Sequence, residues 1–242
     1  MTDRRDDDFR VRPSAPKNRG KGQGQSFVSK VLKQAGKASS GKSTMRRPGA
    51  TGGTGQRPGS RLGRGYTAAR FAGAKLTPMS RRVTIKTLLV NHQRASPQSL
   101  AKHLHYIERD GVGRDGEPGQ AYGPQTDVAD LDAFKERCAD DRHHFRFILS
   151  PEDGAELEDL RTYTRHLMGR MEADLGTDLD WVAVNHWNTD NPHTHIVVRG
   201  RDDTGKDLII AGDYIADGFR HRAAELATEW LGPRTELEIQ QT

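Results

Sequence analysis

The amino-acid composition changes sharply near residue 80, and this change limits which part of the chain can fold. Residues 36–65, GKASSGKSTMRRPGATGGTGQRPGSRLGRG, are mainly Gly, Ser, Thr, Pro and basic residues with almost no large apolar side chains. Such a segment cannot bury enough apolar surface to offset the conformational entropy lost on folding. We therefore predict a disordered basic arm over residues 1–80 and a folded domain over residues 81–240.

The two segments also differ in charge. Residues 1–79 hold 18 lysines and arginines against 4 aspartates and glutamates, a net charge of +14. Residues 80–242 hold 20 basic against 29 acidic residues, a net charge of −9. A basic arm joined to an acidic body indicates a nucleic-acid partner, although a solvated tail without a fixed ligand would have the same composition.

Cysteine usage and hydropathy bear on where the protein works. Cys138 is the single cysteine of the sequence, so no internal disulfide can form, which fits a reducing compartment. No apolar run approaches the ~20 residues of a membrane-spanning helix. The first residues, MTDRRDDDFR, lack the apolar core of a signal peptide. We therefore expect a soluble, cytoplasmic protein.

Strand-forming and helix-forming patterns alternate after residue 80. Runs rich in β-branched and apolar residues predict strands over 81–92, 143–150, 179–187, 193–200 and 206–210. Amphipathic periodicity predicts helices over 96–111, 130–140, 150–176 and 213–232. Ser96 would cap the first of these helices and Ser150 the third. This order predicts an α+β fold, an antiparallel-rich central sheet with helices packed on one face.

Three histidines lie close together in VNHWNTDNPHTHIVVRG, residues 184–200. His193 and His195 alternate along a strand and therefore point to the same face of the sheet. The turn-forming residues WNTDNP, 187–192, predict a hairpin that sets His186 across from them. Three neutral imidazoles can bind one metal ion and leave coordination positions open; three separate surface histidines are the alternative. An ion without a negatively charged ligand suits an anionic substrate such as a phosphodiester.

Two further segments accompany this hairpin. They are HLHYIERDGV at residues 103–112 and FRFILSPEDG at residues 145–154. Together with HWNTDNPHTH they resemble the HUH-class relaxases, the mobilisation nucleases of conjugative plasmids and integrative elements, over residues 81–238. The resemblance implies a metal-dependent nuclease that cuts one DNA strand at a nick site held single-stranded within an origin of transfer and forms a 5′-phosphotyrosine. It also implies Mg²⁺ or Mn²⁺ on the three histidines, with relaxosome accessory proteins and a coupling protein as partners.

The resemblance assigns the nucleophile to Tyr106. On the predicted helix this side chain lies off the apolar stripe, next to Lys102, His103 and Arg109. Nearby cations favour the phenolate, which is the reactive form of a tyrosine. Tyr122, in the Gly-rich segment GQAYGP, is the competing candidate.

An acidic residue between the first two histidines often orients a ligand imidazole in the family. Asp190 is the candidate here, although a role in capping the turn would explain it equally well. We expect DNA phosphates to be attracted mainly by the basic arm, together with Lys102, Arg109, Arg199 and Arg201.

Other functions fit parts of the same pattern. A replication initiator or transposase of the HUH class would use the same histidines and a tyrosine. A three-histidine metallohydrolase that acts on a small molecule would not need Tyr106, so Tyr106→Phe should leave it active. A non-catalytic DNA-binding module would tolerate replacement of the histidines.

Overall fold

The computed structural model of the chain describes residues 63–95 and 98–240. Its centre is a four-stranded antiparallel sheet with the order β1-β2-β4-β3. The strands are β1 (Val83–Asn91), β2 (His143–Pro151), β3 (Trp181–His186) and β4 (His193–Arg199). The α+β class is therefore confirmed, and the strands predicted at these four places are present.

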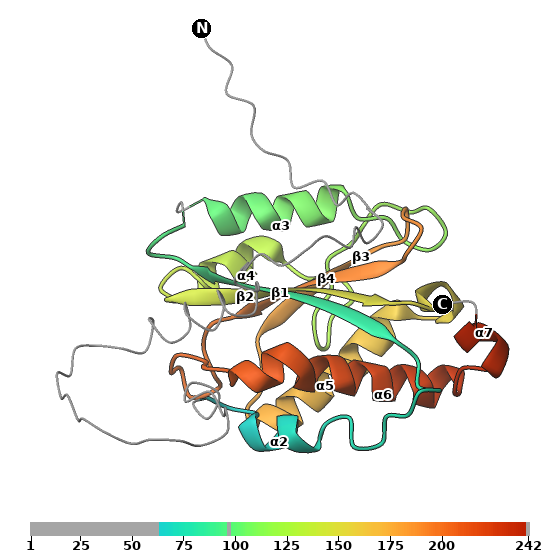
Figure 1. Cartoon of the computed structure of the whole chain (residues 1–242). Helices are drawn as coiled ribbons and strands as arrows, with labels where there is room; N and C mark the ends of the chain where they lie inside the picture. Colours follow the sequence, from blue (N-terminus) through green and yellow to red (C-terminus); the bar gives the residue numbers. More distant parts are fainter. Residues whose placement is uncertain (1–62, 96–97, 241–242) are drawn as a thin grey trace, which may run out of the picture.

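Helices cover both faces of the sheet (Figure 1). On one face lie α3 (Ser99–Arg109) and α4 (Leu131–Arg137). On the other face lie α5 (Leu160–Leu175), α6 (Phe219–Leu231) and the short α2 (Tyr66–Phe71). The remaining elements are η1 (Gly154–Glu156), η2 (Tyr214–Gly218) and α7 (Glu236–Gln240). No helix within the described residues is long and apolar enough to cross a membrane.

The prediction of helices on one face only was wrong, because the central strands are apolar on both faces. On β4, Ile196 and Val198 belong to the larger core beneath α5 and α6. Val197, between them, belongs to a second core with Leu104 and Ile107 of α3. The second core covers only part of its face. The exposed side chains of Lys86 and Leu88, on the same face of β1, leave that part of the sheet open.

The folded body begins upstream of the predicted boundary at residue 81. Arg64 forms a parallel bridge with Ile210 and an ion pair of 2.9 Å with Asp202. The apolar side chains of Tyr66 and Leu76 pack against the larger core. These contacts reach distant parts of the chain, so the composition of this segment alone did not reveal them. The rest of the predicted arm lies outside the described residues.

Two local predictions also differ from the structure. Residues 206–210 form no strand; Ile210 and Asp207 make isolated bridges instead. The third predicted helix begins at Leu160, where the Asp159 side chain accepts hydrogen bonds from the backbone N–H groups of Arg161 and Thr162. Ser150 cannot cap this helix because it stays in β2, paired with β1. For α3 the N-cap position is Gln98, and Ser96 lies outside the described residues.

The edge strand β3 is covered by the Gly-rich segment 111–123. Tyr122 exchanges two backbone hydrogen bonds with Ala183, at 2.9 and 2.8 Å, and the backbone of Val112 accepts one from Trp187 at 3.0 Å. Where this segment folds back on itself, a Cβ atom on Gly119 would lie 2.5 Å from the backbone of Gly111. The glycines therefore allow the close approach that closes this edge.

Candidate active site

The β3–β4 hairpin brings the three histidines together. His186 pairs with His193, and the next pair on the same face sets Val184 opposite His195. The ring centroids are 4.6 Å apart for His186 and His195, and 5.2 Å apart for each of the other two pairs. One ring nitrogen from each residue lies within 4.8 Å of the other two. We call this group the histidine triad.

Backbone carbonyls fix the tautomers of two members of the triad. The Nε2 atom of His186 donates a hydrogen bond of 2.9 Å to the carbonyl of Ile107. The Nδ1 atom of His193 donates one of 3.0 Å to the carbonyl of Asn191. Because a carbonyl can only accept, these nitrogens carry the protons and the opposite nitrogens keep their lone pairs. The residues therefore fit a metal ion, since two of the three imidazoles are held in a form that can coordinate it.

Burial keeps the triad neutral. It lowers the pKa of His186 and His193 below the ordinary histidine value. It lowers the pKa of His195 to about 2, with a further contribution from the neighbouring His186 and His193. Neutral imidazole is the form that binds metals, so no proton has to leave before binding near neutral pH.

Helix α3 reaches the triad through two residues. The carbonyl of Ile107 holds His186, and the ring of His103 lies 6.3 Å from that of His195, centroid to centroid. Tyr106 lies between these two positions on the same helix, with 39% of its surface exposed. The guanidinium of Arg109 stands 5.8 Å from the centre of the Tyr106 ring. Tyr106 is thus an accessible phenol on the helix that contacts the triad.

The other tyrosines are engaged in the fold. All five tyrosines of the sequence lie in the described residues, and among them only Tyr106 is exposed. Tyr122 is fully buried and donates a hydrogen bond of 2.7 Å to Asn185, and burial raises its pKa. Tyr163 and Tyr214 are also buried, with their hydroxyls bonded to the Ala223 carbonyl and to Asp174. This leaves Tyr122, the competing candidate from the sequence, without access to a substrate.

Asp190 does not contact the triad. It is exposed in the hairpin loop, and within the described residues no hydrogen bond joins it to a histidine. The second ring nitrogen of His193 faces the Asn191 carbonyl at 3.0 Å and the Thr189 hydroxyl at 3.4 Å. Thr189 and the Asn191 carbonyl therefore orient the ring of His193, the role that was expected of the Asp190 carboxylate.

A second polar cluster lies next to the triad, beneath α3. The sequence analysis did not predict it. The Arg146 guanidinium donates to Nε2 of His144 at 2.9 Å, and Nδ1 of His144 lies 2.6 Å from Nε2 of His92. Arg146 also donates to the Ser99 carbonyl at 3.2 Å. Burial lowers the pKa of His144 to about 2, and burial together with Arg146 lowers that of His103 to about 3.

Arg146 has an unusual environment for a half-buried arginine. Within the described residues its hydrogen bonds go to His144 and Ser99, and no carboxylate pairs with it. Burial lowers its pKa to about 10, so it stays charged near neutral pH. The signal in the sequence was alternation: His144 and Arg146 share the face of β2 that lies on the triad side.

The cations expected to bind DNA divide into two groups. Arg199 and Arg201 both pair with Asp141, at 2.8 and 2.7 Å, and the Asp141 carboxylate is completely buried. These two partly exposed arginines are thus paired within the fold. Lys102 and Arg109 are exposed on α3, the helix that carries Tyr106, and Arg109 pairs with Asp110 at 2.7 Å.

The comparisons with known proteins agree with this site. Residues 114–225 match the family model described as "Relaxase: MobA/VirD2-like, nuclease domain". The matched segment contains β2, α5, β3 and β4, and therefore the whole triad, whereas Tyr106 lies before it. A comparison with curated proteins gives no match. The segment that holds the whole triad is therefore similar to a MobA/VirD2-like relaxase nuclease domain.

Proposed function

We propose that this protein nicks one DNA strand at the origin of transfer of a mobile element and keeps the cut 5′ end covalently on Tyr106. The observation that carries the proposal is the position of Tyr106. It is the exposed tyrosine, and its helix contacts the triad through His103 and Ile107. The relaxase match supports DNA nicking as the activity.

The proposed reaction is a transesterification. The Tyr106 oxygen attacks the scissile phosphorus and loses its proton to solvent, and the bond from phosphorus to the 3′ oxygen breaks. The products are a 5′-phosphotyrosine and a 3′-hydroxyl, which takes up a proton. Attack by a 3′-hydroxyl on the phosphotyrosine reverses the step and joins strands. The bond energy of the phosphodiester is thus conserved, and the strand can be transferred without another energy source.

The triad is proposed to hold Mg²⁺ or Mn²⁺, which would polarise the phosphoryl oxygens. The protein's own contribution is to present three neutral imidazoles, two of them fixed by carbonyls. Arg146 adds a positive charge close to the triad, and Lys102 and Arg109 add more on the exposed side of α3. These cations attract the backbone of a single strand that passes Tyr106.

The basic arm is proposed to supply non-specific attraction to DNA, since the body has a net negative charge. Relaxosome accessory proteins, a coupling protein and a cytoplasmic location remain expectations from the resemblance. Cys138 is buried as a free thiol, which suits a reducing compartment.

The test is covalent capture. The full chain is incubated with Mn²⁺ and a pool of single-stranded DNA of random sequence, and SDS-resistant adducts are isolated and sequenced. We expect the wild type to enrich one short sequence, Tyr106→Phe to give no adduct, and His193→Ala to give far less. Tyr66→Phe is the matched control, because it removes a phenol on the far face of the sheet, and its yield should equal that of the wild type.

Each alternative function has its own outcome. An adduct that persists in Tyr106→Phe would reject Tyr106 as the nucleophile. No adduct from the wild type, together with hydrolysis of a small phosphodiester that Tyr106→Phe retains, would favour the metallohydrolase. DNA binding that survives His193→Ala with no adduct from any variant would favour a non-catalytic module.

A further inference from the structure

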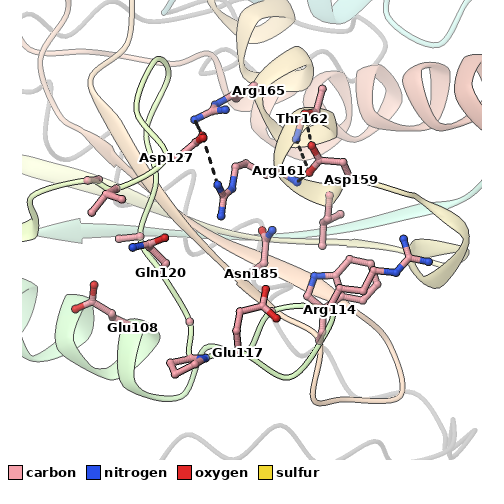
Figure 2. A pocket seen from close by; sticks show the side chains of 18 of the residues that line it. Glu108, Arg114, Glu117, Gln120, Asp127, Asp159, Arg161, Thr162, Arg165 and Asn185 are labelled. Atoms are coloured by element: carbon pink, nitrogen blue, oxygen red, sulfur yellow. Dashed lines mark hydrogen bonds and ion pairs between the residues drawn. The ribbon is translucent and has the colours of Figure 1, made fainter.

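A cavity of about 750 Å³ lies at the β3 edge of the sheet, between the Gly-rich segment 111–123 and the start of α5 (Figure 2). It is lined by the Gly-rich segment, by the start of α5 and by two residues of the hairpin, Asn185 and Trp187. These two flank His186 in the sequence, and the cavity also reaches Glu108, two residues after Tyr106. Asn185 faces the α5 side of the sheet and His186 the α3 side, so the cavity lies at the edge of the sheet, next to the strand and the helix that carry the candidate active site.

The charges around the cavity disfavour a phosphate group. Arg161 and Arg165 pair with Asp127, at 3.4 and 2.8 Å, as Figure 2 shows. Arg114 donates to the carbonyls of Leu157 and Glu158, at 3.2 and 2.9 Å. The carboxylates of three lining residues have no ion-pair partner within the described residues: Glu108, Glu117 and Glu158. Such a cavity suits a neutral ligand that donates hydrogen bonds.

Asn185 presents a fixed donor to the cavity. Its Oδ1 atom accepts hydrogen bonds from the hydroxyls of Tyr122, at 2.7 Å, and Thr194, at 2.9 Å. This oxygen is therefore occupied, and the amide orientation is set. The Nδ2 group has no acceptor within the described residues. Asn185 thus offers N–H donors to a ligand, opposite the acceptors of Glu117 (Figure 2).

Trp187 gives the cavity an aromatic wall. Its indole is half-buried, and the Arg114 guanidinium stands 5.3 Å from the ring centre. Unstacked bases of single strands pack on aromatic rings and arginine planes, and they are read by hydrogen bonds along their edges. The cavity combines such a platform with a donor and several acceptors.

We propose that this cavity receives one nucleobase of the attacked strand, a base that carries an exocyclic amino group. The proposal rests on the proposed function, because the strand must pass Tyr106 to reach the cavity. Adenine and cytosine present an amino group to the glutamate side chains and a ring acceptor to Asn185. Thymine has no amino group, and its single ring N–H lies between two carbonyl oxygens that the carboxylates would repel. The cavity would thus help to select the nick site.

The experiment measures binding without cleavage. Fluorescently labelled dA8, dC8 and dT8 are titrated with the full chain at one fixed salt concentration, without divalent metal. We expect dA8 or dC8 to bind more tightly than dT8, by about fivefold or more, the lower end of what one base-edge contact contributes. Glu117→Gln should remove this preference. Trp187→Leu should weaken all three oligonucleotides, because stacking is tolerant of sequence.

Asp115→Asn is the matched control, since it removes the same charge from an exposed position in the same segment, outside the lining of the cavity. Its preference should equal that of the wild type. Equal affinities for all three oligonucleotides in the wild type would overturn the proposal. So would an unchanged preference in Glu117→Gln, or an equal loss in Asp115→Asn.

Covalent capture separates this proposal from the proposed function. An adduct on Tyr106 with the same enriched sequence in the wild type and in Glu117→Gln would reject the base cavity and keep the nicking activity. A base preference that depends on Glu117, with no adduct from the wild type, would reject nicking and keep the cavity as a base-binding site.

Discussion

Replacement of Arg146 by glutamine tests whether the cluster beneath α3 serves DNA or the fold. The fall of the Arg146 pKa from its ordinary value to about 10 corresponds to about 3 kcal/mol of lost solvation for the cation. Partial contact with solvent reduces this cost to about 2 kcal/mol. The hydrogen bonds to His144 and Ser99 contribute about 1 kcal/mol each in the opposite direction. The two effects cancel, so the free energy of unfolding should change by less than about 1 kcal/mol.

DNA binding should respond differently from stability. Each phosphate contact on a single strand contributes about 0.7 to the slope of log affinity against log salt concentration. We expect Arg146→Gln to lower this slope by about that amount and to weaken binding at low salt. Urea denaturation and fluorescence anisotropy measure the two quantities.

The matched control is a second replacement of arginine by glutamine, at a position far from the triad. Arg170→Gln removes a cation that pairs with Glu229 on the far helices, and it should alter neither the slope nor, by more than about 0.5 kcal/mol, the stability. The reasoning about Arg146 would be refuted by a destabilisation above about 2 kcal/mol with an unchanged salt slope. That result would make Arg146 a structural residue.

Four further predictions concern metal binding, ion pairing, pH dependence and the basic arm. At Mn²⁺ concentrations one hundred times the dissociation constant, the wild-type melting temperature should rise by about 5–10 °C in a thermal-shift assay, and His193→Ala should lose most of this rise. Asp141→Ala should lower the free energy of unfolding by about 2 kcal/mol in urea, because Arg201 loses its carboxylate partner and Arg199 keeps only the longer contact with Asp180, at 3.9 Å. The pKa of His144 is lower in the folded state than in the unfolded state, so its contribution to stability is complete above about pH 6.5 and declines as the pH falls. The urea midpoint of the wild type should therefore fall between pH 6.5 and 4, and His144→Gln should make this fall smaller. Deletion of residues 1–62, which hold 15 basic and 4 acidic residues, should weaken DNA binding and flatten its salt dependence. The yield of covalent adduct with a short enriched oligonucleotide should stay unchanged. An adduct yield that falls as much as the binding does would contradict a purely attractive role for this segment.

The sequence was informative where the relevant geometry is local. Alternation along β4 placed His193 and His195 on one face, and a six-residue turn was enough to set His186 opposite them. The position of Tyr106 off the apolar stripe of α3 likewise follows from helical periodicity, and the structure shows the side chain exposed. The ligand set needs only two neighbouring strands, so it could be recognised before the fold was known.

The sequence was less informative where distant segments compete. Ser150 and Asp159 are both good capping residues, and only the pairing of Ser150 with β1 decides between them. The contact of Arg146 with α3 joins segments 47 residues apart. Arg199 looked like a free cation because its partner, Asp141, lies 58 residues away. No local sequence pattern predicts long-range pairings of this kind.

The hydrogen bond from His186 to the Ile107 carbonyl couples the triad to α3, the helix that carries Tyr106. A cation that orders the His186 ring also favours the docked position of α3, and a docked α3 in turn raises the affinity for the cation by the same factor. Hydrogen exchange at the amides of the last turn of α3 should therefore slow when Mn²⁺ is added. Through this one bond, cation loading would govern how well Tyr106 is positioned before any DNA arrives.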